Sequence, residues 1–371
     1  MKAQIKELGD IITGNTPSKQ EQGFWDSADI CFVKPDMIGE CGIEQITDSK
    51  EYISEKSRRK ARIVNSNAIL VTCIGTIGKV GIVRKECAFN QQINAIVPNQ
   101  RVAPKYLAYC LLYNRGRLAE IANAPVVPII NKTQFGEFVV DIEDNKAKQM
   151  EIVETLDLVS SVIESRKQEI RKLDELIKAR FVEMFGDPLN NPYRWKKEAL
   201  ITNATLLNGR AYKQEELLDS GKYPVLRVGN FFSNRGWYYS DLELEDDKYC
   251  NDGDLLYAWS ASFGPQIWNG GKVIYHYHIW KVLVGDSYNK IFLCKLLDYA
   301  TESLMGDTHG IAMMHLTKSG MEQTEFIVPP IALQEEFAVF CTQVDKSKAA
   351  VQQALDKAQL LFDSLMQQYF G

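Results

Sequence analysis

The first half of the chain contains the scattered elements of a nuclease pattern. Pro35 and Asp36, followed by Asp48 and Lys50, fit the loose PD…(D/E)xK arrangement of carboxylates and a lysine. Three short elements at free spacing match often by chance, and Gly-Asn at 229–230 stands where the second half of the chain would repeat Pro-Asp. We therefore keep a nuclease that uses Asp36 and Lys50 only as a remote alternative.

Two further fragments resemble parts of nucleotide-handling motifs. Asn-Asn-Pro-Tyr at 190–193 is similar to the N-P-P-Y loop of adenine methyltransferases, but its second residue is not Pro and no F-x-G-x-G cofactor loop accompanies it. Gly-Thr-Ile-Gly-Lys-Val at 75–80 is similar to part of a P-loop, but Val80 stands where Ser or Thr must bind Mg²⁺. We interpret the first fragment as a linker turn and the second as a tight turn between strands.

Histidine and cysteine spacing indicates no metal site. His276 and His278 alternate as in a strand and could present two imidazoles on one face, but no third ligand is placed nearby; His309 and His315 are the other two histidines. We expect ordinary strand histidines, and neither a metal nor a cofactor. The cysteines form no C-x-x-C pair and sit near no histidine, which favours reduced structural thiols in a cytosolic protein. They are Cys31, Cys41, Cys73, Cys87, Cys110, Cys250, Cys294 and Cys341.

Local basic segments stand out against a net charge of −5. Residues 50–62 carry six Lys or Arg against two Glu, which fits either a solvated basic helix or a phosphate-binding face. The second half of the chain adds scattered arginines and is rich in Trp and Tyr; most of these aromatic residues should be core, and one or two could contact bases or sugars. The cations that could contact phosphates or bases are Lys56, Arg58, Arg59, Lys60, Arg62, Arg210, Lys213, Arg227 and Arg235.

Length and composition indicate a globular protein of two or three domains. The chain has 371 residues, of which 45% are hydrophobic and 25% charged. No apolar run approaches the 18 residues of a membrane span, and the first ten residues lack the hydrophobic region of a signal peptide. We expect a cytoplasmic protein without a membrane partner.

The chain repeats itself once. Asn67 to Gly78 matches Gly253 to Gly264 at an offset of 186 residues, and the segment from Lys105 matches the segment from Lys290 at 185. Gln149 to Gly186 matches Gln334 to Gly371, again at 185. A nearly constant offset across separate blocks indicates two similar halves.

Each half ends in one long helix with a heptad seam of apolar residues. Arg166, Arg180 and Lys348 are polar members of the seams and should help to fix the register. The first helix must stop near residues 186–188, because Gly caps a helix and Pro cannot continue it. Two such stripes in one chain are most simply hidden by antiparallel pairing, which predicts a rod with a β-rich domain at either end. The first seam contains Ile152, Leu156, Val159, Ile163, Arg166, Ile170, Leu173, Ile177, Arg180 and Met184, and the second contains Phe337, Cys341, Val344, Lys348, Val351, Leu355, Ala358, Phe362, Leu365 and Tyr369.

The predicted fold class is α+β, with two β-rich domains in a pseudo-two-fold arrangement joined by two long antiparallel coiled-coil helices. Short apolar runs punctuated by Gly, Pro and Asn indicate the strands of each half. The predicted parts are a first β-rich domain, a first long helix, a second β-rich domain and a second long helix, at residues 1–144, 145–187, 188–330 and 331–371.

Apolar residues also repeat beside the seams and need a surface to cover them. One interpretation is that each set packs on its neighbouring β-rich domain. The other is that the two equivalent sets dock two equivalent partner subunits, because a pseudo-symmetric scaffold offers each site twice. The candidate partner-binding residues are Leu176, Phe181, Phe185, Leu361, Met366 and Phe370.

Over its whole length the chain resembles the specificity (S) subunit, or HsdS, of type I restriction-modification enzymes. The resemblance departs from the family pattern at Asn67-Ala68, where Gly-Asp is usual, and at residues 142–144, which lack the usual Pro-Pro; both departures concern turn geometry. It is carried by Leu8 to Ile11 with Thr16 to Ser18, by Ala68 to Lys79 with Asn90-Gln91, by Lys172 to Pro188 with Trp195, and by Pro329-Pro330 with Leu333 to Glu336.

The resemblance implies a DNA-binding subunit that is itself non-catalytic. Two target-recognition domains would read the two unlike halves of a bipartite double-stranded DNA target, and the helices would set their spacing. Two methyltransferase (M) subunits would carry S-adenosylmethionine and flip the target adenine, and restriction (R) subunits would cleave. The alternative outside this family is a coiled-coil adaptor or scaffold with no role on DNA.

Overall fold

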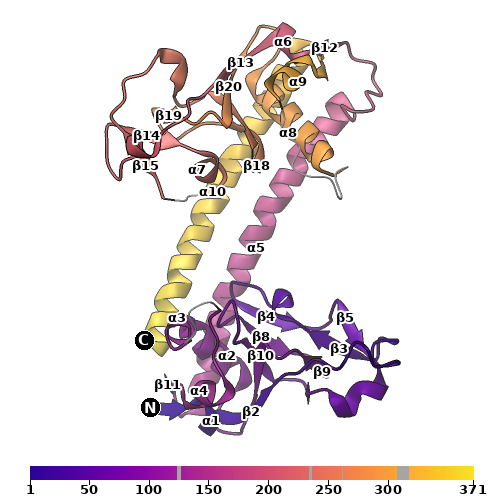
Figure 1. Cartoon of the computed structure of the whole chain (residues 1–371), viewed down its shortest axis with the longest axis vertical. Helices are drawn as coiled ribbons and strands as arrows, with labels where there is room; N and C mark the ends of the chain where they lie inside the picture. Colours follow the sequence, from indigo (N-terminus) through magenta and orange to yellow (C-terminus); the bar gives the residue numbers. More distant parts are fainter. Residues whose placement is uncertain (123–126, 234–235, 261, 307–316) are drawn as a thin grey trace. The chain divides into compact units, whose positions relative to one another are not determined.

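The contacts of this computed structural model divide the chain into two compact units, and each unit contains parts of both long helices. The first unit is Met1–Gln168 with Gln352–Gly371, and the second is Glu169–Val351. Figure 1 labels many of their helices and strands. The structure describes residues 1–122, 127–233, 236–260, 262–306 and 317–371.

The first unit contains a five-stranded sheet in the order β2-β10-β7-β8-β4, a four-stranded sheet in the order β5-β3-β9-β6, and the pair β1-β11. One core lies between the five-stranded sheet and the helices, and a second lies between the two larger sheets. The strands are β1 Lys2–Gln4, β2 Gly9–Thr13, β3 Ile30–Val33, β4 Ile43–Ile46, β5 Glu51–Ile53, β6 Ile63–Val64, β7 Ile69–Thr72, β8 Val80–Val83, β9 Cys87–Phe89, β10 Ile93–Pro98 and β11 Val139–Asp141. The helices are α1 Ile5–Leu8, η1 Pro35–Met37, η2 Glu55–Lys60, α2 Pro104–Tyr113, α3 Arg115–Glu120 and α4 Lys132–Glu137.

The fragment at 75–80 that is similar to a P-loop is a turn between two antiparallel strands, as predicted. Gly75 and Gly78 both adopt φ of +78°, which L side chains rarely take. The segment joins β7 to β8, so a strand follows it where a P-loop requires a helix.

The second unit repeats this plan with a four-stranded sheet β13-β20-β17-β18, a four-stranded sheet β15-β14-β19-β16, and the pair β12-β21. Its strands are β12 Lys197–Ala199, β13 Ala204–Asn208, β14 Tyr223–Leu226, β15 Tyr238–Ser240, β16 Tyr249–Cys250, β17 Leu255–Ser260, β18 Ser262–Ile267, β19 Val273–Tyr275, β20 Ile279–Val284 and β21 Glu325–Ile327. Its helices are α6 Leu200–Asn203, η3 Gln214–Glu216, α7 Val228–Phe232, η4 Asp246–Lys248, α8 Lys290–Gly306 and α9 Lys318–Gln323.

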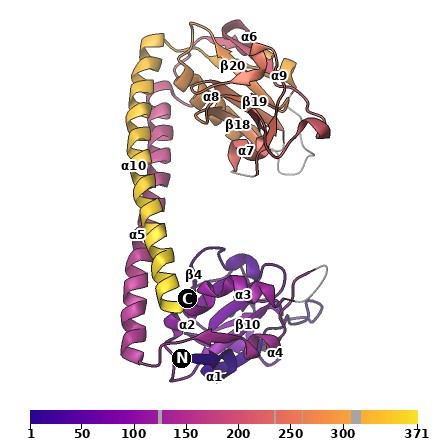
Figure 2. The ribbon, with the colours of Figure 1, turned by 90° about the vertical axis from the view of Figure 1, so that its left-hand side faces the viewer.

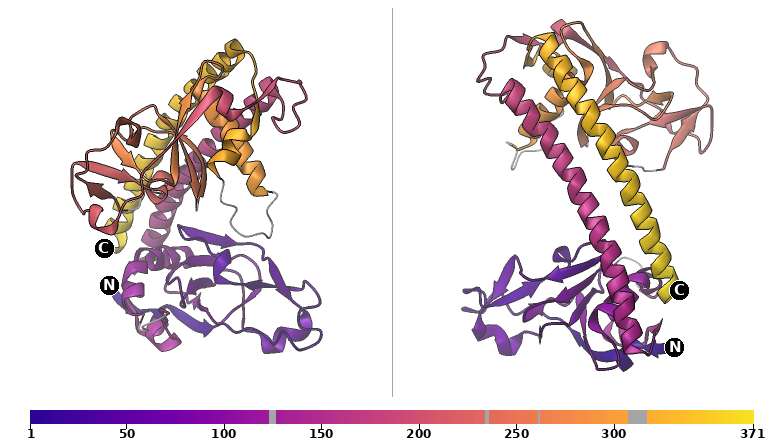
Figure 3. Two further views of the ribbon diagram at one scale, coloured as in Figure 1. Left: turned by 45° about the horizontal axis from the view of Figure 1, so that its top comes forward. Right: turned by 180° about the vertical axis from the view of Figure 1, so that it is seen from behind.

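The long helices α5 (Lys146–Phe185) and α10 (Ile331–Phe370) pack antiparallel, as predicted. In the first unit the start of α5 packs on the end of α10, where Ile152 and Phe362 border one core. In the second unit the end of α5 packs on the start of α10, where Ile177 and Cys341 share another core. Figures 2 and 3 show α10 running beside α5. All twenty predicted seam residues are buried or half-buried.

Two of the polar seam residues make ion pairs between the helices. The Lys348 ammonium pairs with Asp174, and the Arg180 guanidinium lies 3.1 Å from the Glu336 carboxylate. Such pairs are satisfied in one alignment of the helices and lost in shifted ones, so they favour the observed register.

Helix α5 ends at Phe185, just before Gly186 and Pro188, as these two residues predicted. Gly186 adopts φ of +73° and donates its N–H to the Val182 carbonyl at 2.8 Å, a left-handed cap that only Gly adopts readily. Beyond it, the Asn191 side chain accepts the Trp195 N–H at 2.9 Å and donates to the Trp195 carbonyl at 2.8 Å. The Asn-Asn-Pro-Tyr fragment is therefore the predicted linker turn.

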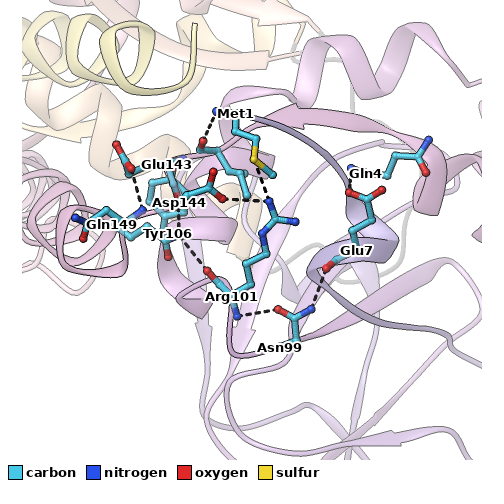
Figure 4. Close-up of polar contacts among 11 residues, drawn as sticks. Met1, Gln4, Glu7, Asn99, Arg101, Tyr106, Glu143, Asp144 and Gln149 are labelled. Atoms are coloured by element: carbon cyan, nitrogen blue, oxygen red, sulfur yellow. Dashed lines mark hydrogen bonds and ion pairs between the residues drawn. The ribbon is translucent and has the colours of Figure 1, made fainter.

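A buried glutamine ties the start of α5 to the first unit. The Gln149 amide accepts the Ala103 N–H at 2.8 Å and donates to the carbonyls of Glu143 at 2.6 Å and Arg101 at 3.2 Å. The residues around it appear in Figure 4, with the N-terminal ammonium of Met1 held by a neighbouring carbonyl. A fully buried amide needs all of its hydrogen bonds, so this network fixes where the helix leaves the domain.

The second unit repeats that network bond for bond. The Gln334 amide accepts the Asn289 N–H at 2.9 Å and donates to the carbonyls of Pro329 at 2.7 Å and Ser287 at 3.0 Å. These three partners lie 186 positions after their counterparts around Gln149. The predicted duplication is thus confirmed at the level of individual hydrogen bonds.

The short helices α2 and α8 correspond at an offset of 186, one more than the sequence comparison gave. The ring of Tyr106 lies 5.2 Å from that of Phe370, and the ring of Phe292 lies 4.7 Å from that of Phe185. Tyr106 and Phe292 therefore occupy equivalent core positions. The predicted offset of 185 for this helix was wrong, because its apolar pattern reads similarly in either register.

Candidate nucleic-acid interface

The basic segment of the first unit, residues 50–62, contains strand β5 and the short helix η2 and ends just before strand β6. Arg58 is committed to the fold, since its guanidinium lies 2.7–2.8 Å from both carboxylate oxygens of Glu86 and also pairs with Glu55. These pairs raise the pKa of Arg58 and lower the pKa of Glu86. Arg58 is therefore half-buried and neutralised.

The other cations of this segment are exposed. The Lys56 ammonium donates to the Gln22 carbonyl at 3.0 Å. Arg59, Lys60 and Arg62 are exposed, and no carboxylate in the described ranges pairs with them. Three unpaired cations within four residues form a surface suited to phosphate oxygens.

Hydrogen bonds join this surface to two distant segments. The Asn15 side chain donates to the Lys60 carbonyl at 2.6 Å and accepts the Arg62 N–H at 2.7 Å. The next residue, Thr16, donates its hydroxyl to the Gln91 side chain at 2.7 Å. The segments around residues 15, 61 and 91 thus meet at one end of the first β-rich domain.

A groove runs from this end along strand β2. Its first part, of about 520 Å³, is lined by residues 11–13 and 61–63 and by Lys132. Its second part, of about 560 Å³, shares Ile11 and Lys132 and extends to Lys6, Asp10 and Glu137. Arg62 and Lys132 give the first part a positive lining.

The second unit brings the corresponding segments together with different side chains. The Arg210 N–H donates to the Tyr275 carbonyl at 3.0 Å, and the Tyr277 N–H donates to the Arg210 carbonyl at 3.1 Å. The Arg210 guanidinium lies 2.7 Å and 2.9 Å from the two carboxylate oxygens of Glu216 and lowers the pKa of that group to about 2. Arg210, like Arg58, is engaged by its own domain.

The other predicted cations of the second unit differ in their surroundings. The Arg227 guanidinium lies 4.3 Å from the Tyr238 ring centre, and its Nε is buried with no hydrogen-bond partner in the described part of the chain. Lys213 is exposed, 3.8 Å from the equally exposed Glu215. Arg235 lies outside the described residues.

Two histidines and two aromatic residues form a cluster beside Arg210. The rings of His276 and His278 are 4.7 Å apart, and the Trp259 ring packs edge-on against His278 at 5.1 Å. Burial lowers the pKa of His276 to about 4, and the nearby His278 and Arg227 add to this shift. His276 is therefore a neutral imidazole at physiological pH. Tyr277 at the tip is 39% exposed.

Sequence reasoning missed several residues of these surfaces. Asn15 and Lys132 lie outside the basic segment, and Gln91 entered only through the family resemblance. Lys248, which corresponds to Arg62 at the offset of 186, donates its ammonium to the Asn208 carbonyl at 3.2 Å. The offset of 186, applied to the loops as well, pairs Lys248 with Arg62. Nothing in the local sequence indicates that Asn15 is a site residue.

The residues of the nuclease pattern do not form a metal site. The Lys50 ammonium lies 3.8 Å from Asp36, and both side chains are well exposed. Asp48 instead pairs with Lys85 at 2.9 Å and accepts the Tyr52 hydroxyl. Within the described ranges no group of three His, Cys, Asp or Glu side chains could hold a metal ion.

His309 and His315 lie outside the described residues. None of the described helices is long and apolar enough to cross a membrane.

Four of the six predicted partner-binding residues are core residues of this chain, which corrects that prediction for them. Phe181 and Phe185 are at most 2% exposed and pack on Phe292 of α8. Met366 and Phe370 are at most 5% exposed in the core of the first unit. Their apolar surface is covered by the neighbouring β-rich domain. Leu176 and Leu361 alone remain exposed, at 47% and 51%.

Comparison with known proteins places the chain in one family. A family model described as the type I restriction modification DNA specificity domain matches residues 1–175 and 199–359. The MjaIX specificity subunit of Methanocaldococcus jannaschii is 22% identical over 369 residues, which cover 90% of this chain and 84% of that protein. The HindI specificity subunit of Haemophilus influenzae is 37% identical over 108 residues, which cover 29% of this chain and 23% of that protein.

Solved structures show the same fold. The S subunit of a type I restriction-modification system from M. genitalium superposes with a TM-score of 0.56 at 15% identity, covering 100% of this chain and 96% of that one. A chain from a study of complex assembly in the type I system gives a TM-score of 0.57 at 14% identity, covering 100% and 97%. With the family match over both halves, the chain belongs to the type I restriction-modification specificity subunits, which recognise the DNA target sequence and are themselves non-catalytic.

Proposed function

We propose that this chain reads a bipartite, asymmetric target in double-stranded DNA, one half with each β-rich domain. The observation that carries the proposal is that corresponding segments meet at one end of each domain while their exposed side chains differ. Two readers with one backbone plan and different surfaces fit two unlike half-sites.

Phosphate contacts and base contacts would come from different residues of this end. In the first domain, Arg59, Lys60 and Arg62 are free to neutralise phosphates, which would fix the position of the domain on the duplex. The polar side chains of the segments around residues 15 and 91, which lie beside these cations, would reach base edges. In the second domain we assign phosphate contacts to Lys213 and Arg227, which come from other positions than the three cations of the first domain.

The long helices would set the distance between the half-sites and carry the partner subunits. Leu176 and Leu361 lie 185 positions apart, and each is a large exposed apolar residue on a polar helix. Two equivalent exposed leucines suit two copies of one partner, and we assign them to two M subunits. R subunits would join this core, adenine methylation and its cofactor would belong to M, and the complex would work in the cytoplasm.

The test is the DNA affinity of the assembled M–S complex. Reversing three charges in Arg59→Glu, Lys60→Glu and Arg62→Glu should weaken binding and lower the slope of log affinity against log salt by about 3, because each phosphate contact contributes about 0.9. A control with the same change in net charge is Lys2→Glu, Lys146→Glu and Lys148→Glu, three exposed lysines of the first unit.

An unchanged affinity and salt slope in the first variant, equal to those of the control, would remove these cations from the interface. A wild-type complex that binds no DNA even at low salt would favour the coiled-coil adaptor instead.

A further inference from the structure

One cation of each unit leaves a buried strand at the same place. Lys34 directly follows strand β3, and Arg227 directly follows strand β14. Their backbones match, with φ and ψ of −118° and 162° at Lys34 and of −115° and 164° at Arg227. The carbonyl just before each cation accepts an N–H from the loop that leads to β10 or β20, given by Asn90 at 3.1 Å and by His276 at 2.9 Å. The two side chains therefore start from equivalent positions, at the end of each domain that carries the proposed DNA surface.

The neighbouring strand places a different residue beside each of these cations. Glu51 is the partner of Phe32 in the ladder of β5 and β3, and Tyr238 is the partner of Val225 in the ladder of β15 and β14. Phe32 and Val225 each lie two residues before the cation of their unit. Glu51 and Tyr238 therefore occupy equivalent places in the two sheets.

In the first unit the cation is neutralised by its own domain. The Lys34 ammonium pairs with the Glu51 carboxylate, which also lies 3.8 Å from the Lys19 ammonium. An anion from outside the chain would have to compete with this carboxylate for the Lys34 ammonium. Lys34 is thus engaged in the fold.

In the second unit the cation keeps its charge. The Arg227 guanidinium carbon lies 4.3 Å from the Tyr238 ring centre, and an aromatic ring attracts a cation without neutralising it. No carboxylate in the described ranges forms an ion pair with Arg227. Its Nε is buried without a hydrogen-bond partner among the described residues, whereas its two terminal nitrogens are not buried. A buried donor without a partner destabilises the fold, and native proteins keep such groups chiefly at functional sites.

The imidazole beside Arg227 does not supply the missing acceptor. Burial, and then the neighbouring His278 and Arg227, lower the pKa of His276 to about 4, so this imidazole is neutral. Its Nδ1 already accepts the His278 N–H at 3.4 Å, which leaves the proton on Nε2 as a further donor. Phosphate oxygens only accept hydrogen bonds and carry negative charge, so a phosphate complements both groups.

We propose that the place shared by Glu51 and Tyr238 decides whether the adjoining cation binds a DNA phosphate. Tyr238 is a positioning residue that holds Arg227 charged and accessible to a phosphate of the second half-site. Glu51 withdraws Lys34 from the same contact in the first half-site. This inference rests on the proposed function, because it requires DNA at this end of both domains.

The experiment measures how log affinity depends on log salt for the complete M–S complex on double-stranded DNA. Tyr238→Glu should pair with Arg227 and make the slope shallower by about 0.9, which is the share of one phosphate, and Arg227→Gln should have the same effect. Tyr238→Gln is the matched control, because it removes the ring without adding a charge and should keep most of the slope. Tyr238→Phe, which keeps the ring, should behave as the wild type.

The first unit offers the converse experiment. Glu51→Gln should release Lys34 and make the slope steeper by about 0.9, with a gain in affinity that is the same for all DNA sequences. Glu120→Gln is the control for net charge, because it removes one acidic group from an exposed residue of α3 and should leave the slope unchanged.

Several outcomes would overturn the proposal. They are an unchanged slope in Arg227→Gln, an equal loss in Tyr238→Gln and Tyr238→Glu, and an unchanged slope in Glu51→Gln. A preference altered at one base pair in Arg227→Gln, seen by sequencing duplexes selected from a randomised library, would identify a base contact and would overturn it too. If the wild-type complex binds no DNA even at low salt, the proposed function falls and this inference with it. If the triple charge reversal in the first domain weakens binding and these variants do not, only this inference falls.

Discussion

At the scale of single residues, exposure separates the cations that serve the fold from those free for a ligand. Arg58 and Arg210 each donate two short hydrogen bonds to the carboxylate of one glutamate. Few of their N–H groups remain to bind DNA. Arg59 and Arg62 have no such partner among the described residues. The sequence could mark the basic segment, but it could not rank its members, because Glu86 approaches Arg58 only in the folded chain.

Burial separates the apolar residues beside the seams in the same way. Phe181 and Phe185 continue the aromatic core of the second unit, so an acidic substitution at Phe181 would test folding and not partner binding. Both interpretations of the sequence were open, because a helix pattern shows that a face must be covered but not by which chain. Of the six residues predicted to bind a partner, Leu176 and Leu361 are the two that this chain leaves uncovered.

One prediction at this scale concerns pH. The folded chain holds the pKa of His276 at about 4, against the ordinary value of 6.5, so the unfolded chain binds its proton first as pH falls. The contribution of His276 to stability is therefore complete above pH of about 6.5 and is lost between about 6.5 and 4. In His276→Asn, which installs the residue found at position 90, the urea midpoint should fall less over that window. Equal pH dependence in the wild type and the variant would show that His276 does not titrate this way.

At the scale of elements, the long helices were predictable and the strand pairing was not. The heptad pattern located α5 and α10 to within a few residues, and Gly186 marked the end of α5, because both signals are local. The order β2-β10-β7-β8-β4 depends on contacts between distant segments, and no short sequence pattern encodes it. The segments around residues 15, 61 and 91 meet only through such contacts, which explains why Asn15 and Gln91 escaped prediction as candidate site residues.

The exposed leucines of the helices give a prediction about partner binding. Leu176→Asp together with Leu361→Asp should leave a folded S chain that recruits M subunits about 30-fold more weakly, because a buried apolar anchor contributes about 2 kcal/mol. Each single variant should weaken one of two sites, and the mass of the complex would report one bound M subunit instead of two.

Leu158→Asp is the matched control for this experiment. Leu158 is 68% exposed on α5, but its counterpart at the offset of 185 is Gln343, so it belongs to no equivalent pair. Recruitment of two M subunits at normal affinity by the double variant would place the docking surface elsewhere.

At the scale of the whole molecule, the duplication organises both the structure and the proposed function. Each unit consists of one β-rich domain, the start of the long helix that follows that domain, and the end of the other long helix. Both chain ends belong to the first unit, where Phe370 is buried in the core and the Met1 ammonium donates to the Ile142 carbonyl at 2.6 Å. One plan is thus used twice, and its exposed ends have diverged.

The central claim is that one chain reads two unlike half-sites held at a fixed spacing. It is tested most directly by mapping methylated adenines in the genome of cells that carry this chain with its M subunit, against cells that lack the chain. We expect modified adenines only in the cells with the chain, within one motif of two different defined halves separated by a gap of constant length. A continuous motif, a palindromic motif, or methylation that is the same without this chain would contradict the account.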